Sequence, residues 1–88
     1  MKYFKIIGKA TCPFCVRAKV HLEFNKLPFE YCLVDNSKEL LDYYKTIYKH
    51  NTVPIIILKE DEMDDQFIGG YTELVSFLER QGFADNSG

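Results

Sequence analysis

The stretch Thr11-Cys12-Pro13-Phe14-Cys15 places two cysteines two residues apart, shortly after the apolar run Tyr3-Phe4-Lys5-Ile6-Ile7. Proline is favoured at the first position of a helix, because its φ is already helical and it has no N–H to leave unpaired. The stretch therefore predicts a helix that begins at Pro13 with Cys12 as its N-cap. The unpaired N–H groups and the dipole at such a position stabilise a thiolate relative to a thiol. We expect Cys12 to be a nucleophile near neutral pH.

The second cysteine of the pair, Cys15, lies less than one helical turn after Cys12, so the two sulfur atoms can face each other. One thiol can then attack a disulfide while the other resolves the product. A structural zinc site is less favoured, because it needs four ligands and Cys32, His21 and His50 are isolated in the sequence. A structural disulfide would close a very small loop and contribute little stability. We interpret the pair as redox-active.

Apolar periodicity and turn residues on both sides of the motif predict the remaining elements. Strands are expected over Lys2–Ile7, Phe29–Val34, Ile55–Leu58 and Gln66–Ile68, and helices over Pro13–Asn25, Lys38–Tyr48 and Tyr71–Gln81. The consecutive aliphatic residues of Ile55–Leu58 indicate a strand buried on both faces. The order β-α-β-α-β-β-α, with a right-handed crossover and a hairpin, predicts an α/β fold in which three helices flank a mixed four-stranded sheet.

The three helices are expected to pack through apolar stripes. The first helix carries one stripe at Val16, Val20, Phe24 and Leu27, and a second at Ala18 and Leu22. A helix that is apolar on two sides is expected to pack against more than one neighbour. The second helix carries its stripe at Leu40, Tyr44, Ile47 and Tyr48, with Leu41 at its flank. The last helix carries its stripe at Leu74, Phe77 and Leu78.

Several other segments are given structural rather than chemical roles. The acidic turn Lys59–Asp65 is expected to be a solvated hairpin tip, since it lacks the glycine and the spacing of an EF-hand loop. Residues 84–88 are expected to be a frayed tail. Cys32 is expected to be a small buried hydrophobic residue. His21 and His50 are expected at the surface, without a catalytic role.

The composition indicates one small domain spanning residues 1–88. A hydrophobic content of 47% predicts an ordered fold, and a net charge of −2 gives no basic patch for nucleic acid or anionic lipid. No apolar run approaches the ~20 residues of a membrane helix, and the first residues do not form a signal peptide. We expect a cytoplasmic protein. Thiols are kept reduced in that compartment, which again favours a catalytic cysteine pair.

Four features in this order resemble the dithiol glutaredoxins. They are Lys9 three residues before Cys12, the Cys12-Pro13-Phe14-Cys15 motif, Thr52-Val53-Pro54, and Gly69-Gly70-Tyr71-Thr72-Glu73. Thioredoxins match less well because their motif carries a tryptophan, which this chain lacks, and monothiol glutaredoxins have serine at the place of Cys15. The resemblance covers nearly the whole chain. It implies a thioredoxin-like fold, glutathione as cosubstrate, and neither a metal nor a tightly bound cofactor.

The resemblance also implies roles for the matching residues. Cys12 would be the attacking thiolate and Cys15 would resolve protein disulfides. The residues implied to contact glutathione are Lys9, Phe14, Thr52, Val53, Pro54, Gly70, Thr72 and Glu73. Phe14 stands where many relatives have tyrosine and so lacks a hydroxyl, and Glu73 stands where close relatives often have aspartate and needs a longer reach. Ile55 replaces a glutamine that relatives often carry, and the acidic turn is longer than expected, and these departures put substrate preference in question.

Physical chemistry gives each implied contact a reason. The charge of Lys9 would favour the Cys12 thiolate and pair with a glutathione carboxylate. Val53, before an expected cis Pro54, would pair its backbone with the cysteinyl unit as in a strand. The carboxylate of the γ-glutamyl end would meet N–H groups at the start of the last helix, near Gly70 and Thr72, and its ammonium would meet Glu73. Purely structural roles stay open: a loop charge for Lys9, an N-cap for Thr72 and a turn for Gly69-Gly70.

These features predict a monomeric glutathione-dependent oxidoreductase that reduces protein disulfides and glutathione mixed disulfides. Ribonucleotide reductase is a candidate protein substrate by family analogy alone. One alternative is a module that holds an iron–sulfur cluster between two subunits through Cys12 and glutathione, which the stiffening effect of Pro13 disfavours. A second alternative is a glutaredoxin-like electron donor served by thioredoxin reductase, which Lys9 and the stretch 69–73 disfavour.

Overall fold

The computed structural model of the protein describes residues 2–83. Its elements follow one another as β1 (Lys2–Gly8), α1 (Pro13–Phe24), β2 (Phe29–Leu33), α2 (Lys38–Tyr48), β3 (Ile55–Glu60), β4 (Gln66–Gly69) and α3 (Tyr71–Arg80). This order confirms the predicted one, and most bounds differ from the prediction by one or two residues. The expectation for residues 84–88 lies outside the described residues.

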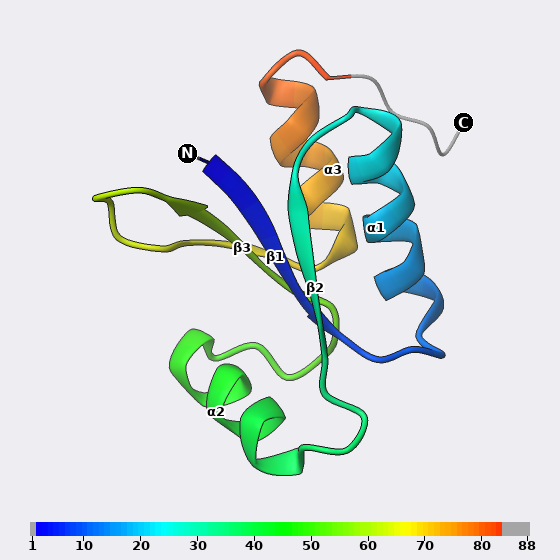
Figure 1. The fold of residues 1–88 in the computed structure, drawn as a ribbon, viewed down its shortest axis with the longest axis vertical. Helices are drawn as coiled ribbons and strands as arrows, with labels where there is room; N and C mark the ends of the chain where they lie inside the picture. Colours follow the sequence, from blue (N-terminus) through cyan, green and yellow to red (C-terminus); the bar gives the residue numbers. More distant parts are fainter. Residues whose placement is uncertain (1, 84–88) are drawn as a thin grey trace.

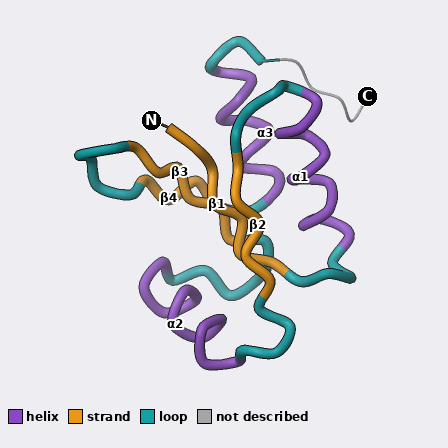
Figure 2. Tube along the Cα trace, in the orientation of Figure 1, coloured by secondary structure: helices purple, strands orange, loops and turns teal. Residues whose placement is uncertain are grey.

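The four strands form one mixed sheet in the order β2-β1-β3-β4. β1 pairs with β2 in parallel, whereas β3 pairs with both β1 and β4 antiparallel. Helices α1 and α3 lie on one face of the sheet and α2 lies on the other (Figure 1, Figure 2). The predicted mixed sheet flanked by three helices is therefore confirmed. Within the described residues, no helix is long and apolar enough to cross a membrane.

The strand β3 divides the core into two layers, because its successive side chains point to opposite faces. Ile56 and Leu58 belong to the cluster under α1 and α3, which also contains Phe4, Ile6, Ala18, Leu22, Leu74 and Leu78. Ile55 and Ile57 belong to the cluster under α2, which also contains Ile7, Val34 and Leu41. These four residues of β3, Ile55 to Leu58, are all buried, as predicted for a strand covered on both faces.

Only one of the two apolar stripes on α1 packs against the protein. Val16, Val20 and Phe24 are 44%, 45% and 57% exposed, so the expectation that both stripes would pack is wrong for these three residues. The buried side of α1 is instead formed by Cys15, Ala18, His21 and Leu22. His21 is 0% exposed, with its ring 6.5 Å from that of Tyr71 in α3, so the prediction of a surface histidine is wrong.

Helix α2 covers the opposite face through a stripe slightly rotated from the predicted one. Leu41 is its buried residue, and Leu40, Tyr44 and Tyr48 pack partly buried beside it. Ile47 is exposed, which corrects its assignment to the buried stripe. The start of the helix is capped by Ser37, whose Oγ accepts a hydrogen bond from the Leu40 N–H at 3.4 Å.

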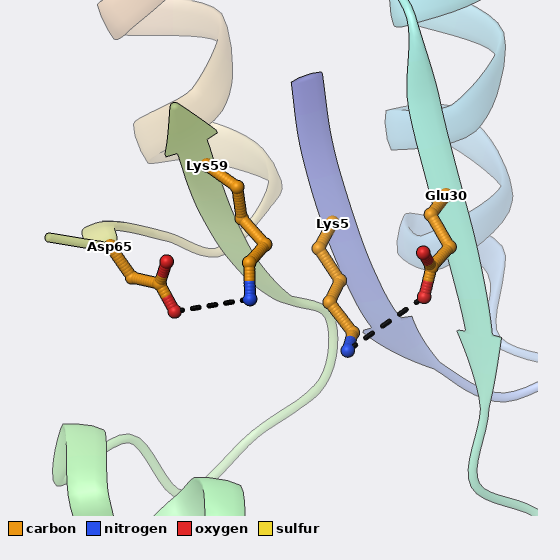
Figure 3. Close-up of polar contacts among 4 residues, drawn as sticks. All are labelled: Lys5, Glu30, Lys59 and Asp65. Carbon is orange, nitrogen blue, oxygen red and sulfur yellow. Dashed lines mark ion pairs between the residues drawn. The ribbon is translucent and has the colours of Figure 1, made fainter. Parts of the chain in front are cut away.

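The acidic turn is shorter than predicted, because β3 continues to Glu60 before the chain turns. Lys59 of β3 forms an ion pair with Asp65 at 3.2 Å across the hairpin, and Glu60 pairs with Lys2 at 3.4 Å. Figure 3 shows Lys59 with Asp65, and beside them Lys5 of β1 with its partner on β2. Residues 61–65 between the strands are all exposed, so the predicted solvated hairpin tip is confirmed, and the two ion pairs lie at its base.

Candidate active site

The sulfur atom of Cys12 lies at the N-terminus of α1. Cys12 has an extended backbone, φ −84° and ψ 115°, and Pro13 occupies the first helical position, as predicted. The Cys15 N–H donates to Cys12 Sγ at 3.4 Å, so the sulfur fills the place of an N-cap acceptor. The same sulfur is 4.0 Å from the Val53 carbonyl oxygen, and Cys12 as a residue is partly exposed. Cys12 is therefore open to attack a substrate from the side of Val53.

The second cysteine, Cys15, is completely buried beneath Cys12. Burial, followed by the hydrogen bond with the neighbouring Cys12 side chain, raises the pKa of the Cys15 thiol to about 11. Only a thiolate attacks a disulfide efficiently, so Cys15 is poorly reactive until a partner comes to it. This asymmetry suits one attacking and one resolving thiol.

The raised pKa of Cys15 makes a testable difference between the two thiols. With iodoacetamide at pH 8, we expect Cys12 to be alkylated first and Cys15 to stay unmodified, because a group with a pKa of about 11 is almost wholly protonated there. Peptide mapping by mass spectrometry at increasing pH would follow both sites, with urea-unfolded protein as the control. Equal labelling of both cysteines in the folded protein at pH 8 would contradict the assigned asymmetry.

A tyrosine and a glycine lie directly behind the cysteine pair. The Tyr31 hydroxyl of β2 donates to the Lys9 carbonyl oxygen at 2.9 Å. Burial, followed by the neighbouring Cys15, raises the pKa of Tyr31 above its usual range, so this hydroxyl stays protonated. Gly8 ends β1 so close to the site that an added Cβ would be 2.8 Å from Cys15 Sγ and 3.0 Å from the Tyr31 hydroxyl. Neither residue was singled out from the sequence for this position.

A groove of about 180 Å³ collects most of the residues that the resemblance assigned to glutathione. Its lining consists of Phe14, His50, Thr52, Val53, Pro54, Gly70, Tyr71, Thr72 and Glu73. Among the residues implied to contact glutathione, Lys9 lies outside this lining, and its side chain is exposed. The peptide bond between Val53 and Pro54 is cis, as expected. Segments far apart in sequence therefore meet in one groove.

The inner end of the groove is the start of α3. Gly70 is the N-cap, and its N–H donates to Glu73 Oε1 at 2.7 Å. The structural alternative of Thr72 as N-cap is therefore wrong. The φ of Gly69 is +128°, a value that favours glycine, whereas the φ of Gly70 is −95° and any residue could adopt it. Of the two glycines, Gly69 is the one that the turn itself requires.

Two aromatic rings form the wall of the groove. Phe14 is 51% exposed, and its ring centroid lies 6.0 Å from that of Tyr71. The guanidinium of Arg17 lies over the Phe14 ring, 5.5 Å from its centroid. Tyr71 was named only as part of a motif, although its position beside Gly70 and Thr72 could have indicated a lining residue.

His50 is the lining residue that the sequence prediction misplaced. It is half-buried rather than exposed, and Nε2 lies 3.3 Å from Thr52 Oγ1. Its nearness to the Thr52-Val53-Pro54 motif was the available signal. Cys32, expected to be fully buried, is partly exposed and packs against the core cluster under α2.

Other hollows and donor groups do not compete with this groove. A larger hollow of about 360 Å³ lies between β4 and α3 and shares Thr72 and Glu73 with the groove, but it is not lined by Val53, whose carbonyl oxygen is 4.0 Å from Cys12 Sγ. Within residues 2–83, no three side chains of cysteine, histidine, aspartate or glutamate gather as a metal site would require. The described donor set therefore does not fit a structural zinc ion bound within one chain.

Comparison with known proteins agrees with this geometry. Residues 4–63 match the family model for glutaredoxin. A glutaredoxin from Vibrio cholerae is 40% identical over 79 residues, and the match covers 82% of this chain and 85% of that protein. The chain belongs to the glutaredoxin family. A glutaredoxin is a thiol–disulfide oxidoreductase, so Cys12 and Cys15 are the candidate redox pair.

Solved glutaredoxin structures share the fold. Glutaredoxin 1 from Francisella tularensis, crystallised with cacodylate, superimposes with a TM-score of 0.74 at 28% identity, covering 92% of this chain and 96% of that one. The glutaredoxin–glutathione complex from buckwheat superimposes with a TM-score of 0.70 at 18% identity, covering 92% of this chain and 71% of that one. The second likeness is one of fold alone.

Proposed function

We propose that this glutaredoxin uses glutathione to reduce glutathionylated proteins and protein disulfides. The observation that carries the proposal is the position of Cys12 Sγ. This sulfur lies at a helix N-terminus, 4.0 Å from the Val53 carbonyl oxygen, and beside the groove whose lining includes most of the residues implied to contact glutathione. The groove offers a backbone edge at Val53, N–H groups at the start of α3, and a carboxylate at Glu73. The buckwheat glutaredoxin of the same fold is a complex with glutathione, which adds support.

For a glutathionylated protein, the reaction needs only Cys12. Its thiolate attacks the glutathione sulfur, the S–S bond to the protein breaks, and the protein leaves as a thiolate that takes up a proton. Cys12 then carries glutathione as a mixed disulfide. A second glutathione thiolate attacks the sulfur of the bound glutathione, which gives glutathione disulfide and restores the Cys12 thiolate. One glutathione thiol is thereby oxidised, the protein sulfur is reduced to a thiol, and both glutathione sulfurs end in glutathione disulfide.

For a protein disulfide, the buried cysteine completes the reaction. Cys12 attacks one sulfur of the disulfide and the other leaves as a thiolate. Cys15 then loses its proton and attacks Cys12 Sγ, which releases the second thiolate of the substrate and leaves a Cys12–Cys15 disulfide. Two glutathione molecules reduce that disulfide and become glutathione disulfide. Because the Cys15 thiol has a pKa of about 11, we expect this second route to be the more sensitive to low pH.

The glutathione dependence is tested by supplying electrons in two ways. We expect the wild-type protein to turn over a glutathionylated peptide with NADPH, glutathione reductase and glutathione, because the groove binds the tripeptide. NADPH with thioredoxin reductase should give little turnover. NADPH oxidation at 340 nm measures both reactions.

The same two assays, together with a visible absorbance spectrum, decide between the proposal and its alternatives. Turnover with thioredoxin reductase that glutathione does not increase would contradict the proposal and favour a thioredoxin-reductase-served donor. Strong visible absorbance of anaerobically purified protein, without turnover in either assay, would favour the iron–sulfur module instead. A matched control is the Cys32→Ser variant, which should behave as wild type because Cys32 packs on the α2 side of the sheet.

A further inference from the structure

His50 is held in the groove from two directions. Its backbone follows the end of α2, where the His50 N–H donates to the Lys45 carbonyl at 3.1 Å. Its ring packs edge-on against Phe67 of β4, with 5.5 Å between centroids, and Phe67 in turn stacks on Tyr48. The imidazole is thereby placed before any ligand arrives. A group fixed in advance loses little conformational entropy on binding, which makes it an effective contact.

The Nε2 atom of this ring faces the start of α3. An added Cβ on Gly70 would lie 3.2 Å from Glu73 Oε1, 3.6 Å from His50 Nε2 and 3.7 Å from the Pro54 carbonyl oxygen. The absent side chain of Gly70 therefore leaves a small socket bounded by one carboxylate, one carbonyl and one imidazole. Thr52 Oγ1, 3.3 Å from His50 Nε2, adds a hydroxyl to the same edge.

The chemistry of the socket matches an α-amino acid group. The carboxylate of Glu73 and the carbonyl of Pro54 accept hydrogen bonds, so they suit an ammonium. A carboxylate on the same carbon needs donors, and among the lining side chains His50 is the one with an N–H, whereas Thr52, Tyr71 and Thr72 carry hydroxyls. Glutathione carries such a pair of groups at its γ-glutamyl end.

We propose that His50 donates a hydrogen bond from Nε2 to the γ-glutamyl α-carboxylate of glutathione, and so acts as a specificity residue for the tripeptide. The inference rests on the proposed function, since it assumes that glutathione occupies the groove. It adds a side-chain contact to the carboxylate, beyond the backbone N–H groups at the start of α3. His50 would then select the γ-glutamyl group without taking part in the chemistry at Cys12.

The test compares two peptide substrates and two variants. One substrate is a glutathionylated peptide, and the other carries 4-aminobutyryl-cysteinyl-glycine, which is glutathione without the γ-glutamyl α-carboxylate. His50→Phe keeps a ring against Phe67 and removes the donor, whereas His50→Gln keeps a donor. We expect His50→Phe to lower kcat/KM for the glutathionylated peptide about tenfold, through KM, and His50→Gln to recover much of that loss. The analogue should be turned over equally by all three proteins.

The outcomes separate this inference from the proposed function. If wild type turns over the glutathionylated peptide and His50→Phe does so equally well, the inference is overturned and the proposed function stands. If His50→Phe slows both substrates to the same degree, the role of His50 is structural and the inference is again overturned. If wild type does not turn over the glutathionylated peptide at all, both fall together. Thermal unfolding of each variant shows whether the comparison uses folded protein.

Discussion

Replacement of Cys12 by serine is expected to abolish disulfide exchange, with kcat/KM for a glutathionylated peptide falling by more than about 1,000-fold. Cys12 is the partly exposed thiol at the helix N-terminus, whereas Cys15 is completely buried and its thiol has a pKa of about 11. A serine hydroxyl is not ionised at neutral pH and does not form a mixed disulfide. Buried Cys15 is therefore not expected to substitute for Cys12. The glutathione-coupled assay measures the loss.

The matched variant Cys15→Ser should separate the two routes. We expect it to keep most of its activity on glutathionylated peptide, because glutathione itself releases Cys12 there. Its reduction of a protein disulfide should be largely lost, since nothing then resolves the mixed disulfide within the molecule. Mass spectrometry should detect the trapped adduct on Cys12. Substantial turnover by Cys12→Ser, or equal loss of both activities in Cys15→Ser, would contradict the assigned roles.

The fold was predictable because the periodicity of apolar residues in strands and helices can be recognised in short stretches of sequence. The aliphatic run Ile55–Leu58 had to be a strand covered on both faces, and Pro13 after Cys12 had to begin a helix. Which stripe of α1 faces the core was not predictable, because Val20 and Leu22 are equally apolar. The packing direction is set by where α3 and the sheet lie, and local sequence does not contain that information.

The candidate site was predictable to the extent that it consists of sequence motifs. Phe14, Val53 and Glu73 were placed together by the resemblance, and they line the same groove. His50 was misplaced because its position depends on the end of α2 and on a ring in β4, two contacts that involve distant segments. Because these contacts join residues that are distant in sequence, no short stretch of sequence predicts them.

Gly8 is a further residue whose importance only the fold reveals. From the sequence it is a glycine that ends a strand, and a glycine there needs no special reason. In the structure its φ is not in the left-handed region, so its backbone could belong to any residue. What excludes a side chain is space: an added Cβ would be 2.8 Å from Cys15 Sγ, 3.0 Å from Cys15 Cβ and 3.0 Å from the Tyr31 hydroxyl. Cys15 is short and completely buried, so it has little room to move aside.

Gly8→Ala is therefore expected to lower the free energy of unfolding by about 1–3 kcal/mol, as overpacking a core does, and Tm by about 4 °C or more. Urea and thermal unfolding of the reduced protein measure both. Gly70→Ala is the control for stability, because its added methyl meets the mobile end of Glu73, and its change should stay below about 1 kcal/mol. If the cause is steric, the cost of Gly8→Ala must shrink when Cys15→Ala and Tyr31→Phe remove two of the crowded atoms. An undiminished cost in that background would show that the strand, and not the space behind the redox pair, requires glycine.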